Sequence, residues 1–184
     1  MDNGTNYRRF LDGDDSGLVE IIREYKDGLI LYLNGFVGSL SLAEELTEDT
    51  FFKLVTKKPK FSGKSSFRTW LYAVAANEAR DALRHSKKHR HAPIENYENS
   101  LSEQESLERS YIKEQNKRKL HKALSRLNPE YRQVLWLVYF EDFSNAEAAS
   151  VMKKSRRQIE NLIYRAKQSL KAELKKEGFT YEDL

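Results

Sequence analysis

Apolar residues recur with a helical period along most of the chain, and the clearest case follows Ser155. Ser155 and Gln158 fit a capping box, in which a serine hydroxyl and a glutamine amide satisfy backbone groups of the first helical turn. Ser144 and Glu147 repeat this pattern just upstream. The apolar face after the second cap recurs every three or four positions and consists of Ile159, Leu162, Ile163, Ala166, Leu170 and Leu174. The pattern predicts a short helix, a tight turn and a second helix.

Three further helical patterns fill the N-terminal half. The first runs from Leu18 to Leu33, and we expect it to break near Gly28. The second begins after Ser41, which fits a capping box with Glu44. Its apolar face consists of Leu46, Phe51, Leu54 and Val55.

The third pattern starts at Ser65 or Ser66, after a polar loop that contains Gly63 and a lone aromatic residue, Phe61. Its apolar positions predict a buried face of Phe67, Trp70, Leu71, Val74, Ala75 and Leu83. Its polar positions predict an exposed face of Arg68, Asn77, Arg80, Asp81 and Arg84.

Residues 92–112 separate the two groups of helical patterns. They are acidic, contain Pro93 and carry little apolar material, which is typical of a flexible linker. No strand pattern and no internal repeat stands out. We therefore expect an all-α protein with one small domain over 1–91, an acidic linker over 92–112 and a helix-turn-helix domain over 113–184.

The distribution of charge says more than its total. The chain of 184 residues has 32 Lys and Arg against 28 Asp and Glu, a net charge of +4. Basic residues crowd at 84–90 and 153–176, and acidic residues crowd at 44–49 and 95–108. Patches of opposite sign indicate more than one macromolecular partner.

Other features disfavour several classes of protein. The chain has no cysteine, which excludes disulfides and thiolate zinc sites. It has no apolar run of about 18 residues, and its N-terminus is too polar for a signal peptide, so we expect a cytoplasmic protein without stable membrane insertion. We find no Gly-rich phosphate loop and no nucleophile elbow, and the acids at 44–49 lie on a predicted helix without a pocket. We therefore expect neither an enzyme nor a bound cofactor.

The last predicted helix is strongly basic on its polar side. Nine Lys and Arg against two acids lie between Lys153 and Lys176. A capped helix that is packed on one side and basic on the other, after a short helix and a turn, suits insertion into the DNA major groove. The alternative is a helical hairpin whose basic outer face is merely solvated.

Three histidines lie close together, His85, His89 and His91. An i, i+4 histidine pair can bind a metal. No carboxylate or cysteine joins them, however, and the neighbouring basic residues would repel a cation. We expect no metal site there, and we interpret the segment as a nucleic-acid contact or a solvated surface.

Two blocks of this sequence resemble the sigma factors of bacterial RNA polymerase. AEELTEDTFFKLV and FSGKSSFRTWLYAVAANEARDALR are similar to the second conserved block of that family, and ALSRLNPEYRQVLWLVYFEDFSNAEAASVMKKSRRQIENLIYRAKQSL is similar to its fourth block. Two blocks joined by a short linker resemble the extracytoplasmic-function (ECF) subgroup. The resemblance covers roughly residues 10–90 and 113–175.

The resemblance implies roles for the N-terminal block. The helix over 43–55 is expected to dock on core RNA polymerase through Glu45, Glu48 and Asp49, although these acids can also simply keep a surface helix soluble. The loop and helix over 61–88 are expected to bind the promoter −10 element and to capture an unstacked base. The implied contacts are Phe61, Ser62, Lys64, Ser65, Ser66, Arg68, Arg80, Arg84, Lys87 and Lys88. Phe67 and Trp70 match family aromatics, but their helical phase favours packing.

The fourth block is expected to bind the −35 element. The implied base-reading residues are Arg157, Glu160, Asn161 and Arg165, since Glu can accept from cytosine and Asn can pair with adenine. The implied contacts to DNA phosphates are Lys153, Lys154, Arg156 and Lys167, because phosphate contacts position a protein without specifying sequence. Ser155, which caps the helix, is a further implied contact to the −35 element. Here IENLIYRAK departs from the usual family pattern, so a known −35 sequence cannot be transferred.

Leu71 stands where primary sigma factors carry a tryptophan, which implies weaker promoter melting.

The implied partners are core RNA polymerase, promoter DNA and, by family analogy alone, an anti-sigma factor. Two alternatives remain open at this point. One is a stand-alone helix-turn-helix regulator whose N-terminal half binds a ligand or dimerises. The other is a decoy that binds polymerase without initiating transcription.

Overall fold

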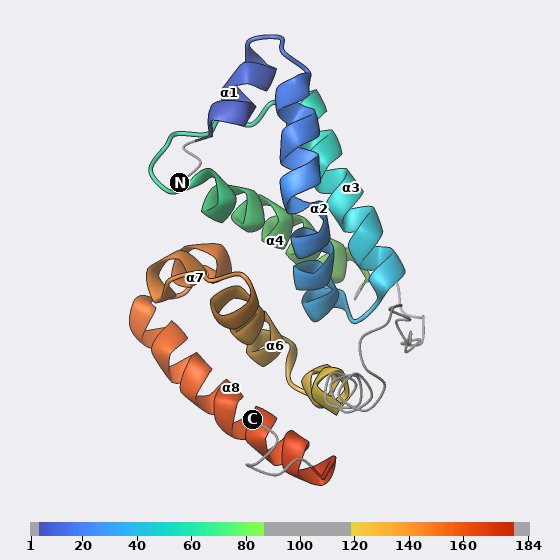
Figure 1. The fold of residues 1–184 in the computed structure, drawn as a ribbon, viewed down its shortest axis with the longest axis vertical. Coiled ribbons are helices and arrows are strands. Elements are labelled where there is room, and N and C mark those ends of the chain that lie inside the picture. Colours follow the sequence, from blue (N-terminus) through green and yellow to red (C-terminus); the bar gives the residue numbers. More distant parts are fainter. Residues whose placement is uncertain (1–3, 87–118, 179–184) are drawn as a thin grey trace, which may run out of the picture.

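We describe the protein from a computed structural model, which describes residues 4–86 and 119–178 (Figure 1). Every regular element in these two ranges is a helix, which confirms the all-α prediction. The N-terminal half contains α1 (Thr5–Leu11), α2 (Ser16–Val37), α3 (Leu40–Lys57) and α4 (Phe67–Ser86). The C-terminal half contains a helical segment over 119–125, α6 (Pro129–Leu135), the π-helical turn η1 (Trp136–Phe140), α7 (Asn145–Met152) and α8 (Arg156–Lys176). The predicted linker over 92–112 lies outside the described residues, so its boundaries stay a prediction.

Helix α2 does not break at Gly28, so that expectation was wrong. The helix continues from Ser16 to Val37 and buries Ile21, Tyr25, Leu29, Tyr32, Leu33 and Phe36 along one side. Apolar packing before and after Gly28 outweighs the modest cost of a glycine inside a helix. The glycine leaves room for other atoms, since a Cβ there would lie 2.5 Å from the Tyr72 hydroxyl and 2.8 Å from the Glu141 carboxylate.

The N-cap of helix α3 lies two residues earlier than predicted. Ser39, not Ser41, is the N-cap, and its Oγ accepts from the backbone N–H of Leu42 at 3.4 Å. Gly38 ends α2 with a left-handed conformation (φ 68°), and the chain turns at once into α3, which leaves Ser39 extended. The predicted apolar face is buried at Leu46, Phe51 and Leu54, whereas Val55 is 41% exposed.

Helix α4 starts where the sequence predicted. Ser66 Oγ accepts from the backbone N–H of Thr69 at 3.2 Å, which is the geometry of an N-cap. Helix α1 was not predicted. It adds Tyr7 and Phe10 to the core, and the Tyr7 hydroxyl donates to the Pro59 carbonyl at 2.8 Å. This bond ties the N-terminus to the loop before α4.

The C-terminal half contains the predicted helix-turn-helix. Both capping boxes are formed, Ser144 with Glu147 on α7 and Ser155 with Gln158 on α8. Helix α6 begins with Pro129 and continues into the π-helical turn η1, which the sequence did not reveal. Lys153, in a left-handed conformation (φ 54°), makes the tight turn between α7 and α8.

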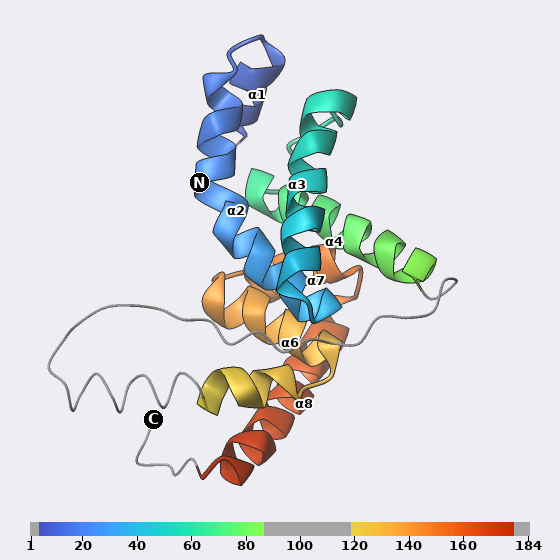
Figure 2. The same cartoon turned by 90° about the vertical axis from the view of Figure 1, so that its right-hand side faces the viewer.

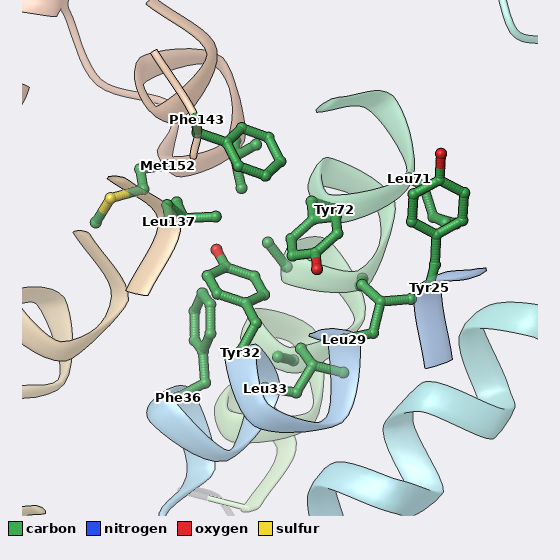
Figure 3. Close-up of a cluster of buried hydrophobic side chains, with 14 of the residues drawn as sticks. Tyr25, Leu29, Tyr32, Leu33, Phe36, Leu71, Tyr72, Leu137, Phe143 and Met152 are labelled. Carbon is green, nitrogen blue, oxygen red and sulfur yellow. The ribbon is translucent and has the colours of Figure 1, made fainter. Parts of the chain in front are cut away.

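One hydrophobic core joins the two halves. Figure 3 shows Tyr32 and Phe36 of α2 facing Leu137 and Met152 of the C-terminal half, and all four are buried. Helix α7 contacts α4, and α6 contacts α2. Helix α8 packs on α6 and α7 and lies at the far side of the C-terminal half from α2 and α3 in both views (Figures 1 and 2). None of the described helices has the length and apolar character that a membrane span requires.

Candidate nucleic-acid interface

Helix α8 presents the basic surface that its sequence predicted. Ile159 and Ala166 are buried and fix the helix on α6 and α7. The capping box at Ser155 sets the first turn, where backbone N–H groups also favour negatively charged ligands. The predicted −35 contacts on this helix are all exposed, namely Arg156, Arg157, Glu160, Asn161, Arg165 and Lys167. The arrangement suits insertion of the N-terminal part of α8 into a major groove.

Several of these side chains already have partners within the protein. Arg156 Nε donates to Glu160 Oε1 at 3.1 Å, an i, i+4 pair on the exposed face. Lys154, which is only half-exposed, forms an ion pair with Glu130 of α6 at 3.0 Å. Exposed pairs of this kind contribute little free energy, so DNA can replace them. Glu160 and Lys154 can therefore bind DNA only after they release their ion-pair partners, Arg156 and Glu130.

Helix α3 carries an exposed acidic face. Glu45, Glu48 and Asp49 are all exposed, and Phe52, one turn further on, is 66% exposed. Residues three and four positions apart are neighbours on a helix, so Phe52 lies beside Glu48 and Asp49. The sequence reasoning missed Phe52, although its phase, opposite to buried Phe51, was visible.

The loop before α4 is arranged for close approach of a ligand. Ser62, Gly63 and Lys64 are exposed, and Gly63 adopts a left-handed conformation (φ 70°) that favours glycine. Ser65 and Ser66 are half-buried.

The aromatic side chains around this loop pack together. Phe61 lies half-buried, with its ring centroid 5.6 Å from that of Phe67 and 5.4 Å from that of Trp70. Phe67 is fully buried, which agrees with the packing role that its helical phase favoured, and Trp70 is half-buried. Phe61 therefore forms the base of the loop, whereas Ser62 and Lys64 form its exposed tip.

The polar face of α4 is not fully exposed as the sequence predicted. Arg84 is exposed and pairs with Asp81. Arg68 and Arg80, however, are half-buried against the C-terminal half. Arg80 Nη2 donates to the Val151 carbonyl of α7 at 3.0 Å. The expectation of a solvated face was wrong here, because α7 packs directly on α4. Lys87 and Lys88 lie outside the described residues.

Glu141 is the centre of the contact between the two halves. Its Oε2 accepts from Arg68 Nη2 at 2.8 Å and from the Tyr72 hydroxyl at 2.7 Å, and its Oε1 accepts from Trp136 Nε1 at 3.3 Å. Burial, followed by the neighbouring Glu141 carboxylate, raises the pKa of Tyr72 well above its usual range. The Arg68 guanidinium also lies 4.5 Å from the ring centroid of Phe143. No sequence pattern pointed to Glu141.

A second carboxylate, Glu147, makes a similar contact. Its Oε1 accepts from Thr69 Oγ1 at 3.1 Å and from Ser66 Oγ at 3.4 Å, while its Oε2 accepts from Ser144. Burial acts against the charge, but these hydrogen bonds outweigh it and lower the pKa of Glu147. The sequence identified Glu147 only as part of a helix cap.

Within the part of the chain that the structure describes, no group of three or more His, Asp or Glu side chains is placed to hold a metal. Of the three clustered histidines, only His85 falls in that part, and it is exposed. The prediction for His89 and His91 therefore lies outside the described residues.

Two segments match known families. Residues 21–89 match Sigma-70 region 2, and residues 117–170 match Sigma-70 region 4. The first segment contains α4 and the exposed acidic face of α3, and the second contains the helix-turn-helix. The two matches occur in the order that the sequence blocks predicted.

Curated relatives and solved structures agree with these matches. The chain is 27% identical over 158 residues to RNA polymerase sigma factor YlaC of Bacillus subtilis, which covers 85% of this chain and 91% of YlaC. It is 27% identical over 159 residues to ECF RNA polymerase sigma factor BldN of Streptomyces coelicolor, covering 86% of this chain and 60% of BldN. Its fold is similar to that of CnrH in complex with the cytosolic domain of CnrY, with a TM-score of 0.65, 19% identity, and 92% and 95% of the two chains covered.

These similarities show that the protein is a promoter-recognition subunit of the sigma-70 type, built from regions 2 and 4. The chain belongs to the ECF sigma factors of bacterial RNA polymerase. Its function is to direct transcription initiation at specific promoters.

Proposed function

We propose that three surfaces divide the work of this sigma factor. The acidic face of α3 docks on core RNA polymerase, the loop over 61–66 together with α4 binds the −10 element, and α8 binds the −35 element. The observation that carries this proposal is the separation of the three surfaces. Each lies on its own element and carries the charge that its ligand requires; the faces of α3 and α8 and the tip of the loop are exposed, whereas Arg68 and Arg80 of α4 are half-buried.

The −35 assignment follows from the geometry of α8. Arg157, Glu160, Asn161 and Arg165 lie on the exposed face within the first three turns and are the proposed base-reading residues. The proposed phosphate contacts surround them and consist of Lys153, Lys154, Ser155, Arg156 and Lys167. In this proposal Arg156 pairs with Glu160 in the free protein and with a DNA phosphate when the protein is bound to the promoter.

The −10 assignment rests on the loop and on α4. An unstacked base needs a pocket edge and a nearby positive charge. Ser62, Lys64, Ser65 and Ser66 supply polar groups around Gly63, and Phe61 supports the loop from beneath. The proposed phosphate track continues along α4 through Arg68, Arg80 and Arg84 to Lys87 and Lys88.

Docking on polymerase is assigned to Glu45, Glu48 and Asp49, with Phe52 as an apolar contact beside Glu48 and Asp49. Aromatic anchors surrounded by charged residues carry much of the energy of protein interfaces. The acids would steer docking toward a basic surface and set its orientation.

We further propose a protein inhibitor for this chain. The similar solved structures include a sigma factor RpoE in complex with the anti-sigma factor NepR of Bartonella quintana, with a TM-score of 0.64, 23% identity, and 85% and 97% of the two chains covered. An anti-sigma factor is the corresponding partner here.

We also propose that the protein works in the cytoplasm, needs no cofactor and catalyses no reaction itself. The domain boundaries at 1–91 and 113–184 belong to the same proposal.

The test is in vitro transcription with purified core RNA polymerase and genome fragments. The expected result is transcripts that start at discrete sites only when the chain is added. Strong binding of the chain alone to discrete promoter sites, without added transcripts, would favour a stand-alone helix-turn-helix regulator. Binding to core polymerase without transcripts would favour a decoy.

A further inference from the structure

Helix α1 lies along the start of the loop that leads from α3 to α4 (Figure 1). Gly4, Tyr7 and Phe10 follow one another at intervals of three, so they face the same side of this helix and its N-cap. All three approach residues 58–61. The helix and this segment run antiparallel, since Phe10 contacts the start of the segment and Gly4 contacts its end. The part of the chain that matches Sigma-70 region 2 begins at residue 21, so α1 lies outside it.

The central contact between α1 and the loop is a hydrogen bond. The Tyr7 hydroxyl donates to the Pro59 carbonyl at 2.8 Å, and the Tyr7 side chain is buried. Burial raises the pKa of Tyr7 to about 12, so the hydroxyl keeps the proton that it donates. The ring centroid of Tyr7 lies 5.3 Å from that of Trp70 and 5.5 Å from that of Phe67. Phe61 of the loop packs on the same two rings, so α1 and the loop rest on the same part of α4.

Two further contacts fix the ends of segment 58–61. A Cβ at Gly4 would lie 2.6 Å from Cε1 of Phe61, so the missing side chain lets the Phe61 ring pack against the start of α1. At the other end, Nζ of Lys58 lies 5.2 Å from the ring centroid of Phe10. Lys58 adopts a left-handed conformation (φ 42°), which is uncommon for a residue with a side chain and persists where the surroundings determine it. The contacts with α1 thus help to set the direction in which the chain leaves α3.

We propose that α1 positions the −10 loop, with Tyr7 as the central positioning residue. Helix α1 holds residues 58–61 against α4, so that Ser62, Gly63 and Lys64 reach the unstacked base from a fixed start. The proposal rests on the assignment of this loop to the −10 element. It adds to that site an element that lies outside region 2.

Positioning matters for base capture because the loop tip is exposed. A loop that becomes ordered only when the base arrives loses conformational entropy at that moment, and the base then binds more weakly. A segment that α1 holds beforehand reduces this loss. Removal of the Tyr7 hydrogen bond should therefore weaken base capture and leave closed binding through α8 unchanged.

The experiment compares the full parent chain with Tyr7→Phe and Phe10→Leu. The first variant removes the hydrogen bond to Pro59 and keeps the ring, and the second removes the aromatic face beside Lys58 and keeps an apolar side chain. The matched control is Thr50→Val, because Thr50 is buried and its hydroxyl donates to a backbone carbonyl within α3 at 2.7 Å. Circular dichroism checks that all four chains have the same helix content.

Hydrogen exchange followed by mass spectrometry measures the loop in the free chain, without DNA. Amide exchange over 58–66 should rise about fivefold in Tyr7→Phe and should also rise in Phe10→Leu, since one buried hydrogen bond changes an opening equilibrium by about that factor. Exchange over α8 should stay unchanged in both variants, and Thr50→Val should match the parent over 58–66. Unchanged loop exchange in both variants would overturn the proposal.

A second readout tests the consequence at the promoter. With core RNA polymerase present, open-complex formation is compared on promoters that carry each of the four bases at each −10 position in turn. The parent should prefer one base at the captured position, and Tyr7→Phe should reduce that preference about fivefold. A chain that is merely less stable loses open complex on all four sequences alike, so the ratio between bases separates positioning from stability. An unchanged ratio in Tyr7→Phe, despite faster loop exchange, would also refute the proposal.

Failure of the proposed function gives a different result. In that case the two α1 variants show faster loop exchange, but the parent chain shows no base preference at any −10 position. This outcome would support positioning of the loop by α1 and contradict the assignment of the loop to base capture.

Discussion

The guanidinium of Arg68 on α4 donates to the carboxylate of Glu141, a residue 73 positions later, with Nη2 and Oε2 2.8 Å apart. This pair links the two sigma regions of one chain. It also shows that a side chain suited to DNA has a protein partner in this conformation. The following predictions test the packing and the surfaces on either side of this pair.

Tyr32→Phe should raise the free energy of unfolding by about 1 kcal/mol, because it removes a buried hydroxyl that has no hydrogen-bond partner among the described residues. Tyr7→Phe is the matched control of opposite sign, since the Tyr7 hydroxyl donates to the Pro59 carbonyl at 2.8 Å. Urea denaturation followed by circular dichroism measures both. Loss of stability in Tyr32→Phe equal to that in Tyr7→Phe would contradict the interpretation.

Glu147→Gln should reduce the loss of stability in acid. The pKa of Glu147 is lowered in the folded chain, where burial is outweighed by hydrogen bonds from Ser144, Thr69 and Ser66. A lowered pKa contributes stability that is fully present above the unfolded value of about 4.3 and is lost as the pH falls through the folded value. Urea midpoints between about pH 6 and pH 3 should therefore fall less steeply in the variant. Identical slopes would show that the charge of Glu147 does not stabilise the fold.

Much of the fold was predictable from local chemistry. The capping boxes at Ser144 and Ser155 satisfy backbone groups within a few residues, so the sequence shows them directly. Ser39 was missed because its role depends on where Gly38 ends the preceding helix. The predicted helix break at Gly28 was wrong because this glycine leaves space for side chains of other elements, which the local sequence does not show.

The candidate surfaces were predictable to different degrees. The exposed faces of α3 and α8 follow from helical phase, because their apolar sides are fixed by nearby packing. The environment of Arg68 and Arg80 was not predictable in this way. Whether a polar face meets solvent or another part of the chain depends on contacts about 70 residues apart in sequence, such as Arg68 with Glu141, and helical periodicity carries no information about them.

Charge reversal on α3, Glu48→Lys with Asp49→Lys, should weaken binding to core RNA polymerase and leave folding intact. Surface substitutions of this kind change stability by under about 0.5 kcal/mol each. Asp12→Lys with Glu24→Lys is the charge-matched control, since both residues are exposed outside the proposed docking face. Fluorescence anisotropy with labelled chain measures the affinity. Equal weakening by both pairs would indicate a general effect of net charge instead of docking through α3.

Asn161→Ala and Lys154→Ala should change DNA binding in different ways. Asn161 is a proposed base reader on the exposed face of α8, so its loss should change which −35 bases are preferred. Lys154, paired with Glu130 in the free chain, is a proposed phosphate contact. Its loss should weaken all sequences alike and lower the salt slope by about one unit. Selection from a randomised −35 library, in complex with core enzyme, distinguishes the two, and the reverse pattern would mean that reading and positioning residues have been exchanged.

Opening of the −10 element is the step that separates an initiation factor from an ordinary DNA-binding regulator. Extrusion of a base costs a few kcal/mol of lost stacking, which contacts in the loop must offset. Replacing residues 62–65 with alanines removes the polar side chains of Ser62, Lys64 and Ser65 and also replaces Gly63, whose φ of 70° disfavours alanine, but it leaves α8 unchanged. The variant should therefore keep closed promoter binding in complex with core polymerase and lose the open complex.

Permanganate footprinting of thymines, with core RNA polymerase and promoter DNA present, measures this opening most directly. The parent chain should make thymines in the −10 region reactive, and the loop variant should leave them protected while a gel shift still shows promoter binding. Normal thymine reactivity with the loop variant would contradict base capture by residues 62–65. Absence of reactive thymines with the parent chain, on a promoter that it binds with core enzyme, would contradict the proposed role in promoter opening itself.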